Sequence, residues 1–489
     1  MERMSTLDAG FFFVEHENVP MHLGSLAVFE GPALSYGELV DLYAAKLPRV
    51  PRYRQVVRTV PLQIVRPAWS DDERFEIGYH IRHAAVPKPG GARQVRRLAG
   101  QIYAQPLNRS RPLWEAWLLK GLEGGRWAIL NKVHHCMVDG IGGSDLMAEI
   151  FDLGPDAGPP VPPAGWEPQP GPSLAGTLAS GVRDAVTGPL RLLGGVPGLV
   201  RGGLPARAGL VAFGRGLTGG ARRLAVPAAS SLNGPVGPGR EWAWTTASLS
   251  RVKQIRRDLG GTVNDVLLAA ITRGFRDVLA ERGDLSDGVV VRSLVPMSVR
   301  GPDEHGMVTN RVSAVVANLP VAEPDPVRRL ALIREQMGEV KRTHQAAGAG
   351  LLTQILGLAP PPLLALASRA AFQLPQPLVQ TVTTNVPGPQ FPLFIRGRQM
   401  VEAHPYVPIG DNVQIAVAIF SYSGRISFGI TADSSAAPDL DVLAQGIGRG
   451  LTELEAQPAA TRPAGARPPA RSGPRGRHAL GRERRANRI

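Results

Sequence analysis

Residues 131–143 of the 489-residue chain, Asn-Lys-Val-His-His-Cys-Met-Val-Asp-Gly-Ile-Gly-Gly, bring together residue types suited to acid–base chemistry. A strand-like run ends at His134 and His135, and a glycine-rich turn that holds Asp139 follows. A neutral imidazole has a pKa of about 6.5, so near neutral pH it can take a proton from a hydroxyl group and return it. The pattern therefore predicts a general base at the histidine pair.

The other residues of this turn suggest supporting roles. Asp139 would compete with a histidine if it acted on the same proton, so we expect it to pair with a cation elsewhere. Gly140 and the glycines after it allow a sharp turn and a close approach of substrate. Adjacent histidines do not match the helical spacing of zinc hydrolases, and the chain has one cysteine, so we expect no metal. From spacing alone, a structural histidine pair remains the alternative.

The complete pattern His-His-x-x-x-Asp-Gly resembles the signature of the coenzyme A-dependent acyltransferase superfamily, which includes chloramphenicol acetyltransferase, plant BAHD enzymes and peptide-synthetase condensation domains. The resemblance implies that His135 is the base and that Asp139 is structural. It also implies an α/β fold, with two chloramphenicol-acetyltransferase-like domains, a long crossover between them and an active-site channel where they meet. In BAHD enzymes an Arg after a strand pairs with the motif Asp, and Arg300 stands in such a place.

A closer resemblance is to the bacterial wax ester synthase/diacylglycerol acyltransferase family, and it runs from about residue 4 to residue 455. The motifs that carry it are Ser5-Thr6-Leu7-Asp8, Pro112-Leu113-Trp114, His134 to Gly140, Ser231-Leu232-Asn233-Gly234-Pro235, Asn264-Asp265 and Asn385-Val386-Pro387-Gly388-Pro389. The chain departs from the family at Asn108, before Arg109, where we expect Asp. That difference affects a local turn.

The resemblance implies O-acyl transfer from acyl-coenzyme A, a co-substrate and not a bound cofactor, to diacylglycerol or a long-chain alcohol. The implied catalytic residues are His135, His134 and Asp139; those that structure the site are Gly140, Arg300, Asn264 and Asp265; and those that contact substrate are Pro112, Leu113, Trp114, Asn310 and Asn385. Two alternatives are an acyltransferase that uses carrier proteins and a catalytically silent lipid-binding protein. Turnover of acyl-coenzyme A separates both from the main interpretation.

Local patterns predict the elements around these residues. Ser35 and Glu38 form a capping box that begins a helix, and Thr262 caps a second helix with Asp265 at its third position. Helices are also predicted over 93–105, from 325–326 onward and over 438–455, and strands over 21–29, 114–119, 127–133, 289–295, 310–319, 378–386, 413–422 and 426–431. On physical grounds Asn264-Asp265 is helix-start chemistry, which we favour over the family's interpretation of a signature near the site.

The net charge of +14 is concentrated in two segments. Residues 173–224 carry +6 and residues 459–489 carry +8, so the rest of the chain is neutral and a basic face for nucleic acid is not indicated. The first residues lack the pattern of a signal peptide, and Cys136 is compatible with a reducing compartment. We therefore expect a cytoplasmic protein.

The composition divides the chain into four parts. They are an N-terminal acyltransferase domain (1–152), a Pro/Gly/Arg-rich crossover (153–239), a C-terminal acyltransferase domain (240–456) and a disordered tail (457–489). Within the crossover, residues 173–224 alternate Arg with Leu/Val pairs, and both a flexible linker and a membrane contact fit this pattern. No run approaches the ~20 apolar residues that span a bilayer. We expect peripheral attachment to the inner face of the cell membrane or to lipid droplets.

Overall fold

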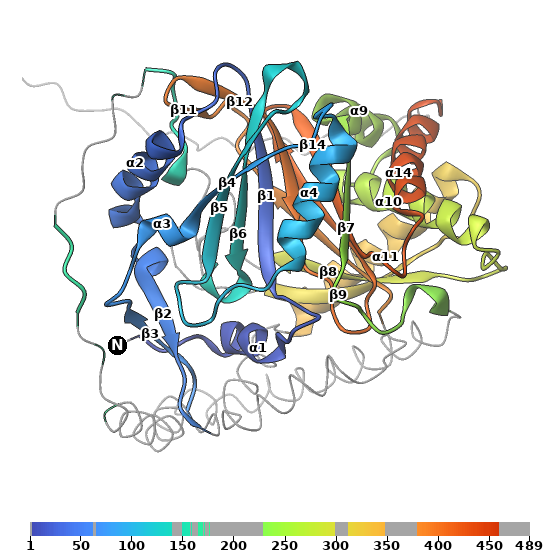
Figure 1. Ribbon diagram of the computed structural model, residues 1–489. Helices are drawn as coiled ribbons and strands as arrows, with labels where there is room; N and C mark the ends of the chain where they lie inside the picture. The colour runs from blue at the N-terminus through green and yellow to red at the C-terminus, as the bar shows by residue number, and fades with distance from the viewer. Residues whose placement is uncertain are drawn as a thin grey trace, which may run out of the picture.

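The computed structural model describes residues 2–61, 65–138, 149–156, 158, 165–169, 171, 176, 228–298, 312–347 and 379–458. Two six-stranded sheets lie beside each other at the centre of the molecule, and helices cover their outer faces (Figure 1). This arrangement confirms the predicted α/β class. No helix in the described part of the chain is long and apolar enough to cross a bilayer.

The first sheet has the order β11-β12-β1-β6-β5-β4. Its strands are β1 (His22–Phe29), β4 (Ile81–Ala85), β5 (Trp114–Lys120), β6 (Trp127–His134), β11 (Phe394–Ile395) and β12 (Arg398–Tyr406). All neighbours are antiparallel except β4 and β5. Because β1 and β5 flank β6 on both sides, its backbone is held firmly up to the histidine pair.

The second sheet has the order β7-β14-β13-β10-β8-β9. Its strands are β7 (Arg240–Ser248), β8 (Val291–Ser298), β9 (Val312–Leu319), β10 (Thr381–Pro387), β13 (Ile415–Tyr422) and β14 (Arg425–Asp433). Strand β10 runs parallel to both of its neighbours, β8 and β13. A separate two-stranded ribbon consists of β2 (Gln55–Arg58) and β3 (Ala68–Asp71).

Helices complete the layers. They are α1 (Thr6–Val14), α2 (Tyr36–Lys46), α3 (Ile77–His80), α4 (Ala92–Ala104), α9 (Leu249–Leu259), α10 (Val263–Glu281), α11 (Pro326–Ala347) and α14 (Leu440–Glu455). Helices α10 and α14 pack together on the outer side of the second sheet, and their apolar faces build the largest core (Figure 1). The predicted capping box of Ser35 with Glu38 is confirmed, and so is the predicted cap at Thr262, which forms a full capping box with Asp265.

The two sheets meet where β12 packs against β14. Strand β12 comes from the C-terminal half of the chain, yet it pairs along β1 in the first sheet, from Gly24 opposite Tyr406 to Phe29 opposite Met400. At the contact, Gly429 of β14 lies so close to the Pro405 carbonyl that a Cβ there would clash. The division at residue 240 stays a prediction, and residues 394–406 are a C-terminal contribution to the first sheet.

The helix α1 was not predicted. Ser5 begins it, because the Ser5 hydroxyl accepts a hydrogen bond from the Asp8 amide at 3.1 Å. Phe12 and Phe13 then enter the core of the first sheet, while Phe11 packs against a different apolar cluster between the two halves of the chain. The helix lies at the lower edge of the molecule in the view of Figure 1, below the end of β6.

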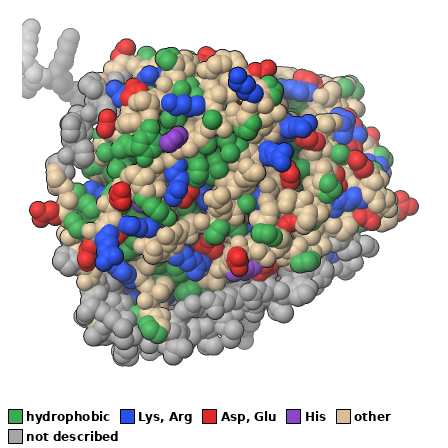
Figure 2. Space-filling model, in the orientation of Figure 1, with side chains coloured by type: hydrophobic (Ala, Val, Ile, Leu, Met, Phe, Trp, Pro, Cys, Tyr) green, Lys and Arg blue, Asp and Glu red, His purple; other side chains and the backbone are tan. Residues whose placement is uncertain are grey.

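Charged side chains of both signs are interspersed over the face shown in Figure 2. The two basic segments identified in the sequence, 173–224 and 459–489, lie outside the described residues apart from Gly176. What these segments contribute to the surface charge is therefore inferred from the sequence alone.

Candidate active site

The histidine pair sits where β6 ends and the chain turns. His134 is the last residue of β6, directly opposite His22 of β1, and its amide donates to the Leu113 carbonyl at 2.9 Å. The next three residues, His135–Met137, form the short 3₁₀ turn η5, and the His135 amide donates to the Met21 carbonyl at 2.8 Å. The main chain of both histidines is thus fixed by neighbouring strands, as the sequence predicted.

His134 is a fully buried residue with both ring nitrogens in use. Its Nδ1 accepts the amide N–H of Cys136 at 3.1 Å, so the ring proton lies on Nε2. Nε2 in turn contacts Oε2 of Glu15 at 2.5 Å. With neither nitrogen available to a substrate, His134 is suited to holding the turn and not to proton transfer.

Glu15, which follows α1, is the carboxylate that fixes His134, and sequence reasoning missed it. Its side chain is 4% exposed and also accepts from Arg109 at 3.2 Å. Burial acts to raise the pKa of Glu15, but His134 and Arg109 outweigh it, so the pKa is lowered and the group is charged. Arg109 also donates to the carbonyls of Phe12 and Glu15, which close the C-terminal end of α1. No local sequence pattern marks Glu15, because its partner His134 lies 119 positions away in the chain.

The expected defect before Arg109 does not occur. Asn108 Oδ1 accepts hydrogen bonds from the Ser110 amide at 3.0 Å and from the Ser110 hydroxyl at 2.8 Å. This local turn needs an acceptor oxygen two residues before the amide, and Asn supplies it as Asp would. The turn therefore still presents Arg109 to Glu15.

His135 has a different environment from His134. Its imidazole is partly buried and stacks on the ring of Phe11, with the ring centroids 3.7 Å apart and the planes 24° apart. Burial, and then the proximity of His134, lower its pKa to about 4, so it is neutral at physiological pH. Its own backbone also acts on the ring, in the direction that raises the pKa. Only Nδ1 can reach that backbone, which leaves the lone pair on Nε2 for a substrate proton.

Several predicted site residues lie outside the described residues. They are Asp139, Gly140, Arg300 and Asn310. The ion pair predicted between Asp139 and Arg300 stays a prediction.

Asn264 and Asn385 are brought together by the fold. Asn385 of β10 donates through Nδ2 to Asn264 Oδ1 at 3.1 Å, in an exposed position. Asp265 forms the capping box of α10, since its carboxylate accepts the Thr262 amide at 2.7 Å. Along β10, Asn385 is three residues, or about 10 Å, beyond Val382, which packs on the same apolar cluster as Phe11. The structure thus brings Asn264 and Asn385 together at an exposed position toward the C-terminal end of β10.

Pro112, Leu113 and Trp114 lie in the interior of the first half. Leu113 and Trp114 are at most 1% exposed, and the Trp114 indole donates to the Tyr53 carbonyl at 2.8 Å. The indole is stacked by Tyr53 and His80, with ring centroids 4.6 and 4.5 Å away. This packing supports a structural role beneath the site.

Cys136 is a second reactive side chain next to His135. The thiol of Cys136 is buried in the first core, and burial raises its pKa well above the ordinary value, so it is not a thiolate nucleophile. Among the described residues, no three His, Cys, Asp or Glu side chains are grouped as metal ligands.

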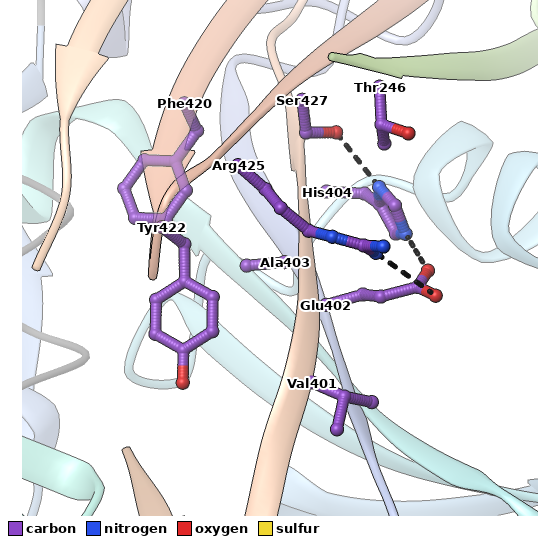
Figure 3. A pocket seen from close by; sticks show the side chains of 9 residues that line it. All are labelled: Thr246, Val401, Glu402, Ala403, His404, Phe420, Tyr422, Arg425 and Ser427. Carbon is purple, nitrogen blue, oxygen red and sulfur yellow. Dashed lines mark hydrogen bonds and ion pairs between the residues drawn. The ribbon is translucent and has the colours of Figure 1, made fainter. Parts of the chain in front are cut away.

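A group of polar side chains around His404 lines a depression between β12 and β14 (Figure 3). His404 Nδ1 lies 2.8 Å from the Ser427 hydroxyl, and its Nε2 lies 2.9 Å from Glu402. Arg126 and Arg425 approach the same carboxylate. Although these residue types can form a catalytic triad, Ser427 is 4% exposed on an internal strand, where β13 and β7 use its main chain. The cluster joins the two sheets.

The His404 group is remote from His135. His404 lies opposite Leu26, which is four residues, or about 13 Å, along β1 from His22, the partner of His134. The depression in Figure 3 is therefore not part of the site at His135.

The fold thus places a buried, carboxylate-held histidine next to a partly buried, neutral one at the end of β6. Comparisons with known proteins identify the family. The catalytic-domain model of the wax ester synthase/diacylglycerol acyltransferases matches residues 4–267, and the C-terminal-domain model matches residues 308–455. The chain belongs to this family and is an acyltransferase.

The relatives agree in extent as well as in family. A probable diacylglycerol O-acyltransferase, Tgs1 of Mycobacterium tuberculosis, is 35% identical over 93% of this chain and 96% of its own length. The wax ester synthase/diacylglycerol acyltransferase of Marinobacter aquaeolei VT8 has a similar structure, with a TM-score of 0.67 at 22% identity over 93% of this chain and 99% of that one. The first condensation domain of a calcium-dependent antibiotic synthetase shares the fold, with a TM-score of 0.57 at 15% identity, over 94% of this chain and 98% of that domain.

Proposed function

We propose that the protein transfers a long-chain acyl group from acyl-coenzyme A to the hydroxyl of diacylglycerol or of a long-chain alcohol, with His135 as the general base. The observation that carries the proposal is the neutral imidazole of His135, which makes no hydrogen bond to another described residue and stacks on Phe11 beside an apolar cluster at the end of β6. The names of the relatives support diacylglycerol as an acceptor.

The reaction needs one base and no covalent intermediate. His135 Nε2 takes the proton of the acceptor hydroxyl as its oxygen attacks the thioester carbonyl. The tetrahedral intermediate collapses, the carbon–sulfur bond breaks, and the proton passes from His135 to the coenzyme A thiolate. The buried Cys136 thiol supports direct transfer, since it cannot serve as the nucleophile. His134 and Glu15 keep the turn in place.

Other residues enter this proposal from the sequence. Asp139 and Arg300 form an ion pair that ties the turn to the second half, and Gly140 lets the chain turn there. Asn310 and Asn385 contact substrate, and Asn264 and Asp265 structure the site. The hydrogen bond from Asn385 to Asn264 supports this assignment, because Asn264 can orient the amide of Asn385.

The test uses purified full-length protein with palmitoyl-coenzyme A and either diolein or hexadecanol. His135→Ala should lower thiol release by roughly 10²–10⁴-fold with the fold intact. His83→Ala is the matched control, because His83 is exposed on β4 and should leave turnover unchanged. Equal turnover of His135→Ala and wild type would overturn the mechanism.

The same assay separates the alternatives. A carrier-dependent acyltransferase would accept an acyl group from a phosphopantetheinyl carrier protein and show little turnover of free acyl-coenzyme A. A silent lipid-binding protein would turn over neither donor. Formation of triacylglycerol or wax ester from acyl-coenzyme A excludes both.

We also propose that the enzyme collects its water-insoluble acceptor at the inner face of the cell membrane or at a lipid droplet. Residues 173–224 would be the principal anchor, since seven Arg accompany repeated Leu/Val pairs. Residues 459–489 carry charge with few apolar groups and would be an auxiliary, salt-sensitive contact.

A further inference from the structure

Helix α1 contacts both histidines through neighbouring side chains. Phe12 meets His134 edge-on, with the ring centroids 6.0 Å apart, and Phe11 lies flat on His135 at 3.7 Å. Adjacent helical residues point about 100° apart, so one helix can present one ring to each histidine. The helix and the turn η5 thus behave as one packed unit.

The two histidines are held by different means. His134 is oriented by a carboxylate on one nitrogen and an amide on the other. His135 shows no hydrogen bond from its ring to another described residue, and its main chain is fixed by Met21. Apart from the contact between its ring and its own backbone, no hydrogen bond to another described residue sets the orientation of the imidazole about its side-chain torsions. The phenyl ring of Phe11, 24° from parallel, limits that orientation because only a narrow range of ring planes allows the stack.

The side chain of Phe11 also packs against apolar residues. It packs on an apolar cluster contributed by both halves of the chain, which includes Val14 of α1, Val382 of β10, and Ala416 and Ala418 of β13. Packing against this cluster therefore restrains the Phe11 ring that stacks on His135. A ring in this position also occupies one face of the imidazole, where water would otherwise lie.

We propose that Phe11 is a positioning residue for acyl transfer, which holds the imidazole of His135 in its reactive plane and keeps water from one face. This inference rests on the proposed role of His135 as the base. Phe11 does for His135 what Glu15 does for His134, but with an apolar surface in place of a carboxylate. A carboxylate at this place would favour the protonated ring, whereas the phenyl ring leaves it neutral and able to accept a proton.

The sign of the effect can be tested. Burial is the largest cause that lowers the pKa of His135 to about 4, so removing the ring should readmit water and raise the pKa toward 6.5. A phenyl face can also attract a cation, and if that attraction dominated, removing the ring would lower the pKa further. The two physical effects therefore predict opposite shifts.

The experiment compares Phe11→Leu, Phe11→Tyr and Phe13→Leu in the full chain. Phe13→Leu is the matched control, since it removes the same atoms from the same helix. The Phe13 ring lies in the core and meets Phe12 edge-on, whereas the Phe11 ring stacks on His135. Two quantities are measured from pH 4 to 8: kcat and KM for acyl-coenzyme A, and the rate at which diethyl pyrocarbonate modifies His135, followed by peptide mass spectrometry. The second reads the neutral fraction of the ring without reference to activity.

Phe11→Leu should lower kcat about tenfold or more with KM within about threefold, because a misplaced base slows chemistry more than binding. Its half-titration by modification should rise by at least about one pH unit toward that of a free imidazole. Phe11→Tyr keeps a flat ring and should restore both quantities. Phe13→Leu should show only a lowered melting temperature.

The proposal is overturned if Phe11→Leu matches Phe13→Leu in kcat and half-titration, or if the half-titration falls. Failure of the underlying function has a separate signature, namely full turnover by His135→Ala. In that case the modification profile of Phe11→Leu would still report whether Phe11 controls the ring.

Discussion

The first prediction concerns Glu15, a buried carboxylate that no sequence pattern indicated. In Glu15→Ala, His134 Nε2–H loses a 2.5 Å hydrogen bond inside the core, and a buried donor without a partner costs about 1–3 kcal/mol. Loss of the charge-assisted bond itself adds about 1.5–3 kcal/mol. Arg109 is 43% exposed and can return to water, so it contributes little further cost. We expect about 3–5 kcal/mol of lost stability.

Glu15→Gln separates shape from charge. The amide oxygen can accept from His134 at the same place, so we expect about 1–2 kcal/mol of lost stability with the turn preserved. Because η5 carries His135 directly after His134, Glu15→Ala should also lower kcat by about 10–100-fold, and Glu15→Gln by much less. Chemical denaturation and thiol release measure the two effects, with the exposed Glu17→Ala as control. Glu15→Ala with the stability and kcat of Glu17→Ala would refute this account of the site.

Three further predictions concern other parts of the molecule. Removing Asp139 or Arg300 alone should cost about 3–5 kcal/mol and the double change less than the sum; additive losses would show that they are not partners. Burial lowers the pKa of His80 to about 4 and also lowers the pKa of His404. The free energy of unfolding should therefore be highest above pH 6.5 and fall toward pH 4, by about 3 kcal/mol from His80 alone. Melting temperatures measured across this range test the prediction, and His80→Asn should lessen the loss. Liposome flotation at high salt should persist without the tail but be abolished when the Leu and Val residues of 173–224 become Ser; flotation of that Ser variant with neutral lipids would place the anchor elsewhere.

Local chemistry determined what could be predicted. The capping boxes at Ser35 and Thr262 depend on residues three apart, and the histidine pair lies on one continuous strand and turn, so all are visible in a short window of sequence. Helices α10, α11 and α14 and most strands of the second half were predicted for the same reason, whereas α9 was not.

The unpredicted features depend on contacts between distant residues. Glu15 meets His134 across 119 positions, and strand β12 joins β1 from the opposite end of the chain. In β12 the run Val401-Glu402-Ala403-His404 alternates apolar and polar residues. Its polar side chains lie on the face toward β14, where Arg126 bonds Glu402 and Ser427 bonds His404. Such a strand has the polarity of an exposed segment until its partners are known.

The histidine pair shows how adjacent identical residues acquire different roles. At the end of a strand, successive side chains point to opposite sides, so His134 enters the buried layer that holds Glu15 while His135 meets Phe11. A carboxylate contact stabilises a ring N–H and makes a rigid support; an apolar stack disfavours the cation and leaves a base. Exchanging the two environments would leave His135 with both ring nitrogens occupied, unable to accept the acceptor's proton. The order of the pair is therefore set by α1, which brings Phe11 and Glu15 to the turn from a single segment.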